Sequence, residues 1–243
     1  MDTNQSAGAK STLRGVVFDL DGVLVDSHAA HRKSWRLFLH TLGRDVTDSE
    51  LDFILDGRKR TDILRHFLGD CPVGEIEEFG RQKDSIFRQV QIAVLPVPGA
   101  VRLVHQLHRS GVALALATSA SPGRGRSTLS ELGLMSCFQA VVTAEDVPAG
   151  KPDPAVYSLA SDRLKIPPRD LLAVEDAVSG VRAALAAGLC CLAVAMHRDP
   201  TALAAAGAAR VISDFEGITF LDLEVILRDG DQLLCRSAGI GSN

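Results

Sequence analysis

Six short apolar runs recur along the chain, and stretches with helical spacing separate most of them. The runs are Gly15–Asp21, Val112–Ser119, Ala140–Asp146, Leu171–Asp176, Cys190–Ala195 and Ala209–Asp214. Continuous apolar runs of this length predict strands of a parallel sheet that is covered on both faces. The helical stretches between them are Gly99–Arg109, Arg124–Leu132, Pro154–Leu164 and Ala177–Ala187. The alternation predicts an α/β fold with a doubly wound parallel sheet.

Between Ser27 and Pro96 this rhythm breaks, because about seventy residues carry helical patterns and no clear strand. We therefore expect a small all-helical domain inserted into a Rossmann-like core, with Pro96–Ala100 as the returning hinge. The expected organisation is a disordered tail at 1–12, the core at 13–27 and 97–229, the helical domain at 28–96 and a C-terminal tail at 230–243.

Composition narrows the class of protein. The chain is 46% hydrophobic and 23% charged with a net charge of -4, which is typical of a soluble globular protein. An aromatic fraction of 5% and the acidic balance argue against a nucleic-acid surface. The N-terminus has no apolar signal-peptide region, and no run approaches the roughly 20 apolar residues of a membrane helix.

The five cysteines have no metal-like spacing, and we interpret them as small core residues in a reducing compartment. These observations predict a cytoplasmic enzyme, monomeric or weakly dimeric, with no nucleic-acid or membrane partner.

Two carboxylates, Asp19 and Asp21, stand at the end of the first apolar run. In a strand, residues two apart share a face and lie roughly 6–7 Å from each other. Their repulsion raises the cost of ionising both unless a cation neutralises them. The pair therefore predicts a bound metal, a proton to move or a phosphate to attack.

Polar residues also follow the later strands: Thr118 and Ser119, then Lys151, then Glu175 and Asp176. Ligands of open α/β sheets bind beyond the carboxyl ends of the strands, so these side chains are expected in one crevice. Four carboxylates alone would repel an anionic substrate. A hard divalent cation with oxygen ligands, most plausibly Mg²⁺, would offset two charges, and the lysine a third. Such a site could accept a phosphate.

Three residues carry candidate roles in phosphoryl transfer. Asp19 is a candidate nucleophile, since aspartate carboxylates form aspartyl-phosphates. Asp21 can act as general acid toward the leaving oxygen and then as base toward water. Thr118 can donate a hydrogen bond to the transferring group.

Together these segments resemble the four motifs of the haloacid dehalogenase superfamily, in the branch with a helical cap inserted after the first strand. DLDGVLVDS resembles the first motif, LATSAS the second, GKPDP the third and VEDAVSGVRAALAAGL the fourth, in the family order. The resemblance extends from about Leu13 to Leu227. It implies Asp19 as nucleophile and Asp21 as acid/base. It also implies Mg²⁺ bound by the Asp19 carboxylate, the Asp21 carbonyl and Asp176, with Glu175 nearby; Glu175 could instead be a structural acid at a helix start.

The helical cap resembles that of the β-phosphoglucomutase and sugar-phosphatase group, in the segments HAAHRKSW and GRKRTD. The implied substrate-binding residues are His31, Arg60, Lys83, Gly57, Ser119 and Ala120. Trp35 is expected mainly in the core of the cap. Arg58 and Lys59 depart from the mutase-like pattern, which weakens the assignment of the mutase's own substrate. The other histidines considered are expected as surface or packing residues: His28, His40, His66, His105 and His108.

Several related activities compete with this interpretation. A haloacid dehalogenase would lack the acid at Asp21, because no leaving oxygen needs a proton. A phosphonate hydrolase would use a cap lysine and usually lacks that aspartate too. A signalling receiver domain would have no cap. We therefore expect a Mg²⁺-dependent phosphatase of small phosphorylated metabolites, with a sugar phosphate as the expected substrate, acting through an aspartyl-phosphate. The alternative is a β-phosphoglucomutase-type mutase.

Overall fold

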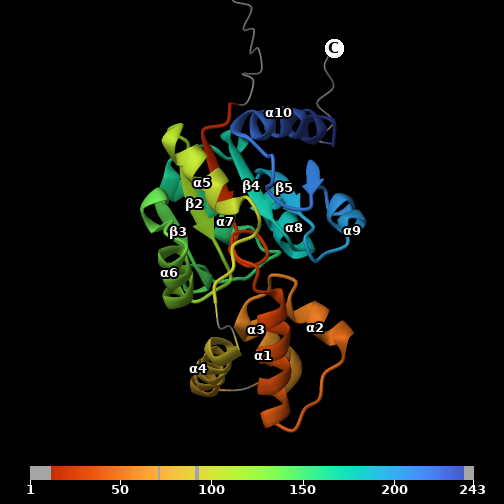
Figure 1. Ribbon diagram of the computed structural model, residues 1–243. Helices are drawn as coiled ribbons and strands as arrows, with labels where there is room; N and C mark the ends of the chain where they lie inside the picture. Colours follow the sequence, from red (N-terminus) through yellow and green to blue (C-terminus); the bar gives the residue numbers. More distant parts are fainter. Residues whose placement is uncertain (1–11, 71, 91–92, 238–243) are drawn as a thin grey trace, which may run out of the picture.

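A six-stranded parallel sheet forms the centre of the protein in a computed structural model that describes residues 12–70, 72–90 and 93–237 (Figure 1). The strands are β1 Gly15–Phe18, β2 Ala113–Ala117, β3 Ala140–Val142, β4 Leu171–Glu175, β5 Cys190–Val194 and β6 Arg210–Ile212. Their order is β3-β2-β1-β4-β5-β6, with every pairing parallel. This is the doubly wound order predicted from the sequence. The chain reverses its direction of winding next to β1, so ligands are expected beyond the carboxyl end of that strand.

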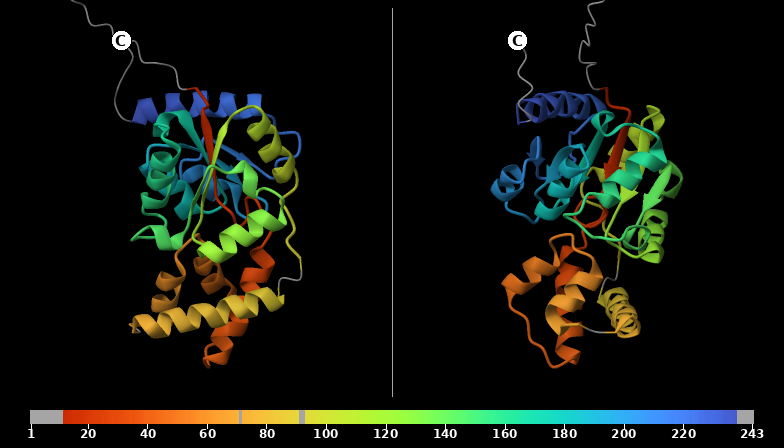
Figure 2. Two further views of the ribbon diagram at one scale, coloured as in Figure 1. Left: turned by 90° about the vertical axis from the view of Figure 1, so that its left-hand side faces the viewer. Right: turned by 180° about the vertical axis from the view of Figure 1, so that it is seen from behind.

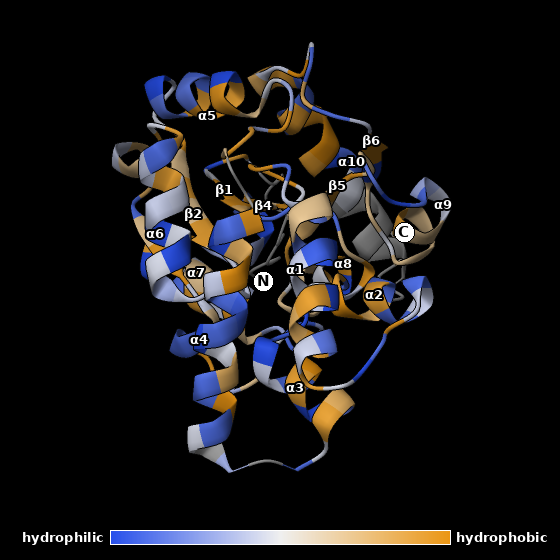
Figure 3. Cartoon of the chain, turned by 60° about the horizontal axis from the view of Figure 1, so that its bottom comes forward, coloured by the Kyte–Doolittle hydropathy of each residue, from blue (hydrophilic) through white to orange (hydrophobic). Residues whose placement is uncertain are grey.

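Successive residues of each strand pack against helices on opposite faces of the sheet. Val16 and Phe18 belong to a buried cluster that includes residues of α5 (Ala100–Arg109) and α10 (Phe220–Ser237). Val17 belongs to a second cluster, with residues of α7, α8 and α9 (Ala155–Leu164, Val178–Ala186 and Pro200–Ala205). Figure 3 shows the same layering, with hydrophobic colour concentrated on the strands and both colours on helices such as α5 and α6 (Pro122–Glu131). Burial on both faces explains why the strands have continuous apolar runs.

Several elements are shorter than the sequence predicts. β1 ends at Phe18, so Asp19 and Asp21 lie in the loop after it, and Asp21 forms an isolated bridge with Val25. The prediction that the two aspartates share one strand face is therefore wrong. The predicted strand Ala140–Asp146 ends at Val142, and a short 3₁₀ turn follows. Two further 3₁₀ turns lie at Met135–Cys137 and Pro168–Asp170.

Four of the five described helices between β1 and β2 form a separate layer at one end of the sheet (Figure 2). They are α1 His28–Thr41, α2 Asp48–Ile54, α3 Arg60–Leu68 and α4 Val73–Val90. They have their own hydrophobic cluster, which includes Trp35, Phe38 and Leu64, and Trp35 is 3% exposed, as predicted for a core residue. We call these helices and their connecting loops the cap. The cap helices pack mainly on one another; the exact domain boundaries given above remain predictions.

The last helix, α10, continues to Ser237 and so extends past residue 229, where the sequence predicted a tail. Residues 1–11 and 238–243 lie outside the described part of the chain, and so does nearly all of the N-terminal tail that was expected to be disordered. Within that described part, no helix is long and apolar enough to cross a membrane. Cys137, Cys190 and Cys191 are buried, whereas the side chains of the other two cysteines lie outside the description.

Candidate active site

A cavity lies between the carboxyl edge of the sheet and the cap. Asp19, Asp21 and Asp176 line it from the core, and Arg60 and Lys83 line it from the cap. Its volume is about 180 Å³, which is smaller than the roughly 300–1,000 Å³ of sites for drug-sized ligands. The cavity brings together side chains from segments far apart in the sequence and suits a small ligand.

Lys151 links two carboxylates at the bottom of the site. Its ammonium lies 2.7 Å from Asp19 Oδ1 and 2.5 Å from Glu175 Oε1, and its side chain is 1% exposed. Tyr157 also donates its hydroxyl to Glu175 Oε1, at 2.6 Å. Glu175 Oε2 accepts the backbone N–H groups of Asp176 and Ala177 just before α8. Both Glu175 oxygens are thus engaged by protein groups, which agrees with its interpretation as a structural acid at a helix start.

Asp19, Glu175 and Asp176 each place a carboxylate oxygen within 4.8 Å of the others. Burial raises the pKa of Asp19 to about 8; the Lys151 ammonium opposes this rise, while the Glu175 and Asp176 carboxylates add to it. Two cations, Lys151 and Arg198, pair with these three carboxylates, which leaves one negative charge without a cation, in line with the raised pKa of Asp19. Carboxylate oxygens are the ligands that Mg²⁺ prefers, so the residues fit a hard divalent cation.

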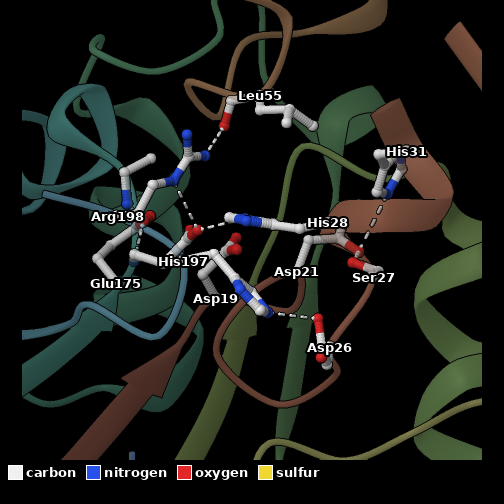
Figure 4. Close-up of polar contacts among 12 residues, drawn as sticks. Asp19, Asp21, Asp26, Ser27, His28, His31, Leu55, Glu175, His197 and Arg198 are labelled. Carbon is white, nitrogen blue, oxygen red and sulfur yellow. Dashed lines mark hydrogen bonds and ion pairs between the residues drawn. The ribbon is translucent and has the colours of Figure 1, made fainter. Parts of the chain in front are cut away.

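Asp176 is held by two basic side chains that the sequence did not reveal. His28 Nε2 lies 2.8 Å and Arg198 Nε lies 3.3 Å from Asp176 Oδ2. The expectation that His28 is a surface or packing residue misses this contact, because its ring lies in the site and the residue is 8% exposed. Figure 4 shows Arg198 extending toward Leu55 of the cap, and the neighbouring His197 directed at Asp26.

Gly22 explains how the loop after β1 approaches Asp176 so closely. Its φ is +77°, in the left-handed region that favours glycine. A Cβ at this position would collide with the Asp176 carboxylate. Glycine is therefore the residue that fits this position of the loop, which accounts for its place after Asp21 in the sequence.

Both carboxylate oxygens of Asp21 accept hydrogen bonds, from residues of the cap, the core and the loop between them. Ser27 Oγ donates to Asp21 Oδ1 at 2.5 Å, and His31 Nε2 lies 3.2 Å from the same oxygen (Figure 4). Arg124 donates to Oδ1 at 2.8 Å through Nη1 and to Oδ2 through Nη2. Burial alone would raise the pKa of Asp21, but Arg124 and His31 hold it well below its usual value. Arg124, near the start of α6, was not among the predicted site residues.

Lys83 and His31 form a buried pair in the cap. The Lys83 ammonium lies 3.1 Å from His31 Nδ1 and stands over the rings of Trp35 and Phe87, at 5.2 and 4.6 Å from their centroids. Burial and the nearby Arg124 lower the pKa of Lys83 to about 7, and burial and Lys83 lower that of His31 to about 3. At neutral pH His31 is therefore a neutral ring that accepts from Lys83 and donates to Asp21.

The three consecutive basic residues of the cap all have partners within the protein. Arg60 Nη1 lies 2.6 Å from Asp84 Oδ2 and donates to the Gly80 carbonyl at 3.2 Å. Arg58 stands over the Phe53 ring. Lys59 donates to the Val147 carbonyl of the core at 2.5 Å. The predicted phosphate contact of Arg60 therefore competes with an ion pair inside the cap.

The loop between α2 and α3 is fastened to the core by hydrogen bonds that we call the carbonyl clasp. The carbonyls of Leu55, Asp56 and Gly57 accept hydrogen bonds from three core side chains: Arg198, Ser179 and Ser119, respectively. Ser119 Oγ lies 2.6 Å from the Gly57 oxygen, so two predicted substrate-binding residues are joined to each other. The clasp closes the cavity on this side.

Thr118 completes the group of predicted core residues. It is 1% exposed, borders the cavity at the end of β2, and accepts the Ala120 N–H at 3.1 Å through Oγ1. Ala120 also lines the cavity. The structure thus brings every predicted site residue to the cavity or its immediate wall, and adds His28, Arg124, Tyr157 and Arg198.

Comparison with known proteins identifies the family of the chain and agrees with its fold. Residues 13–188 match the haloacid dehalogenase-like hydrolase family. The chain is 32% identical over 203 residues to validoxylamine A 7'-phosphate phosphatase of Streptomyces hygroscopicus subsp. limoneus, covering 78% of this chain and 89% of that protein. It is 28% identical over 236 residues to β-phosphoglucomutase of Bacillus subtilis (strain 168), covering 93% of this chain and 99% of that protein.

Among solved structures, CbbY from Rhodobacter sphaeroides in complex with phosphate superposes with a TM-score of 0.75 at 26% identity, covering 87% of this chain and 99% of that one. The match in sequence and in fold extends over both core and cap. The chain belongs to the haloacid dehalogenase-like hydrolase family.

Proposed function

We propose that the protein is a Mg²⁺-dependent phosphatase of small phosphorylated metabolites of the sugar-phosphate class, and that it acts through an aspartyl-phosphate on Asp19. The observation that carries this proposal is the Asp19 carboxylate, which borders a small cavity and lies 2.7 Å from the Lys151 ammonium. A buried carboxylate beside a fixed cation suits attack on phosphorus, because the cation also attracts the incoming dianion.

The proposed chemistry has two steps. An Asp19 oxygen attacks phosphorus and the ester P–O bond breaks. Asp21, once released from the Arg124 guanidinium and protonated from solvent, gives its proton to the departing alkoxide. Asp21 then takes a proton from water, which attacks the same phosphorus and releases phosphate and the Asp19 carboxylate. Thr118 and Lys151 would donate hydrogen bonds to the phosphoryl oxygens in both steps.

Asp19 and Asp176 would hold Mg²⁺ together with the Asp21 carbonyl. When bound, the ion would offset negative charge on the carboxylates and on the phosphoryl group. Glu175 is less suited to direct binding, since its two oxygens already accept four hydrogen bonds from Lys151, Tyr157 and two backbone N–H groups. We assign it the role of orienting Lys151.

Hydrolysis is favoured over phosphate return to the substrate by the position of Arg60. A mutase must hold a bisphosphorylated intermediate and needs a cap cation for its distal phosphate. Arg60, the expected candidate, is paired with Asp84 at 2.6 Å within the cap. Because one relative is named β-phosphoglucomutase, mutase activity is the second candidate function.

A panel of sugar, sugar-acid and polyol phosphates, with each product identified, tests the proposal. We expect free phosphate and the dephosphorylated alcohol in equal amounts, with Asp19→Asn inactive. Rapid formation of glucose 6-phosphate from β-glucose 1-phosphate and a trace of bisphosphate would instead make the enzyme a mutase.

A further inference from the structure

Arg124 and Lys83 approach the same corner of the cavity from opposite sides. Arg124 comes from α6 of the core and Lys83 from α4 of the cap, and both line the cavity. The Arg124 guanidinium carbon lies 5.4 Å and the Lys83 ammonium 4.6 Å from the centroid of the Phe87 ring. Two basic side chains that share one ring make this corner a place where an anionic ligand would be stabilised.

The two cations differ in their partners. Arg124 holds both oxygens of Asp21, and its side chain is 17% exposed. Lys83 is 3% exposed, and among the described residues none forms an ion pair with its ammonium; its contacts are the His31 ring and two aromatic faces. Burial and the nearby Arg124 lower the pKa of Lys83 to about 7, so an anionic ligand at this corner would stabilise the protonated form of this side chain.

The contacts of Asp21 in this structure prevent its proposed role as the acid and base of catalysis. Acid–base work on the leaving oxygen requires Asp21 to reach the substrate. Its oxygens are instead occupied by Arg124, Ser27 and His31. Releasing Asp21 without replacing it would leave the largely buried guanidinium of Arg124, whose side chain is 17% exposed, without an anionic partner. A second carboxylate could take its place, because guanidinium binds carboxylates in a bidentate geometry.

We propose that Arg124 and Lys83 form an anion subsite for a carboxylate on the leaving-group part of the substrate, and that its binding there frees Asp21 for catalysis. This inference rests on the proposed phosphatase function and narrows its substrate class to phosphorylated sugar acids. The carboxylate of Asp21 now occupies the position that the substrate carboxylate takes. A neutral sugar phosphate offers only hydroxyl groups, which compete poorly with an ionised carboxylate for a guanidinium.

The surrounding charges are consistent with this exchange. The titratable and charged groups that act on Lys83 are Arg124, Asp84, Asp21 and Arg60, with His31 in direct contact. Asp84 is paired with Arg60, and Asp21 with Arg124. An incoming carboxylate would therefore pair with Lys83 without displacing an anion, and would pair with Arg124 in place of Asp21.

The test compares two substrates that differ at one carbon: D-gluconate 6-phosphate, which carries a carboxylate, and D-glucitol 6-phosphate, which carries a hydroxyl group there. We expect wild-type kcat/KM to favour the acid by at least about tenfold. Arg124→Gln should bring this ratio close to one, and Lys83→Met should lower it. Arg126→Gln is the matched control, since Arg126 is exposed on the same helix, and it should keep the wild-type ratio.

A binding measurement distinguishes failure of the anion subsite from failure of the proposed phosphatase function. Calorimetric titration of both compounds into Asp19→Asn should show tighter binding of the acid, and the double variant Asp19→Asn, Arg124→Gln should lose that difference. Turnover of both esters with a ratio near one, or a ratio unchanged in Arg124→Gln, overturns the subsite. Arg124-dependent binding of the acid without turnover of any ester keeps the subsite and overturns the phosphatase.

Discussion

Lys151 and Asp19 lie 132 positions apart in the sequence, yet their charged atoms are 2.7 Å apart at the bottom of the cavity. Lys151 follows β3 and Asp19 follows β1, so the parallel sheet brings their loops to the same edge. Glu175 holds the same ammonium from the other side at 2.5 Å. The lysine is therefore fixed in position before any substrate arrives, and fixed charges cost no reorganisation during the reaction.

Replacing this lysine should abolish most activity. Lys151→Met removes a positioned cation from the phosphoryl group, so we expect kcat to fall by about 10²–10³-fold. Steady-state kinetics against any active ester measures the loss, with circular dichroism to verify folding. Lys33→Met, at an exposed position of α1, should keep the wild-type rate. A folded Lys151→Met variant with near wild-type kcat would contradict the role of Lys151.

Activity should depend strictly on Mg²⁺, and Asp176 should set the affinity. Asp176→Ala removes one charged oxygen ligand, so the Mg²⁺ concentration for half-maximal rate should rise by at least about tenfold. Calorimetric titration of Mg²⁺ provides a second readout without turnover. Asp162→Ala, which alters an exposed acid on α7, serves as the control. Full wild-type activity in excess chelator would refute the metal assignment.

Arg60 should act mainly within the cap. Arg60→Ala breaks the pair with Asp84 on α4, so we expect a loss of about 0.2–1 kcal/mol in the free energy of unfolding. KM should change by a modest factor while kcat stays nearly intact. Asp84→Asn breaks the same pair but keeps the arginine. A large rise in KM for Arg60→Ala, absent in Asp84→Asn, would show that Arg60 binds substrate directly.

The buried Lys83 should make stability depend on pH. Its pKa is lowered to about 7 in the folded protein, against about 10.4 in an unfolded chain. Between these values the unfolded chain binds the extra proton. The free energy of unfolding therefore gains up to about 1.4 kcal/mol per pH unit as pH rises, and this contribution is lost as pH falls through 7.

Lys83→Met removes this titration and the cost of burying the ammonium. Relative to wild type, the variant should be most stabilised near pH 6, and the difference should shrink toward pH 9. Urea unfolding of both proteins across this range measures it, with Lys33→Met as the control. A difference that stays constant with pH would mean that Lys83 keeps an ordinary pKa.

The sequence predicts the core of this protein well because its signals are local. Continuous apolar runs identify the strands, and the parallel sheet then forces the residues after each strand to one edge. Asp19, Thr118, Lys151 and Asp176 could be assigned to one crevice on this basis alone. The strand ends were less predictable, since the loop after Phe18 depends on the close approach of Gly22 to Asp176.

The cap side of the site could not be predicted in the same way. Arg124 and Arg198 are ordinary basic residues of a helix and a loop. Arg124 reaches Asp21 through the packing of α6 within the core, and Arg198 reaches Leu55 through the packing of the cap on the core. Arg60 matches a known pattern in sequence, but its pairing with Asp84 depends on how α3 packs against α4. Long side chains can turn toward either of two partners, and sequence spacing does not decide between them.

The central claim is that Asp19 becomes phosphorylated during turnover. The most direct test uses Asp21→Asn with p-nitrophenyl phosphate. The leaving group of this ester departs without a proton, so the first step still occurs, whereas the second step lacks its base and the intermediate accumulates. Rapid quenching, borohydride reduction of the acyl phosphate and peptide mass spectrometry should find homoserine at position 19, only when both ester and Mg²⁺ are present. Stoichiometric release of p-nitrophenol with Asp19 unmodified, or modification of a different carboxylate, would contradict the account.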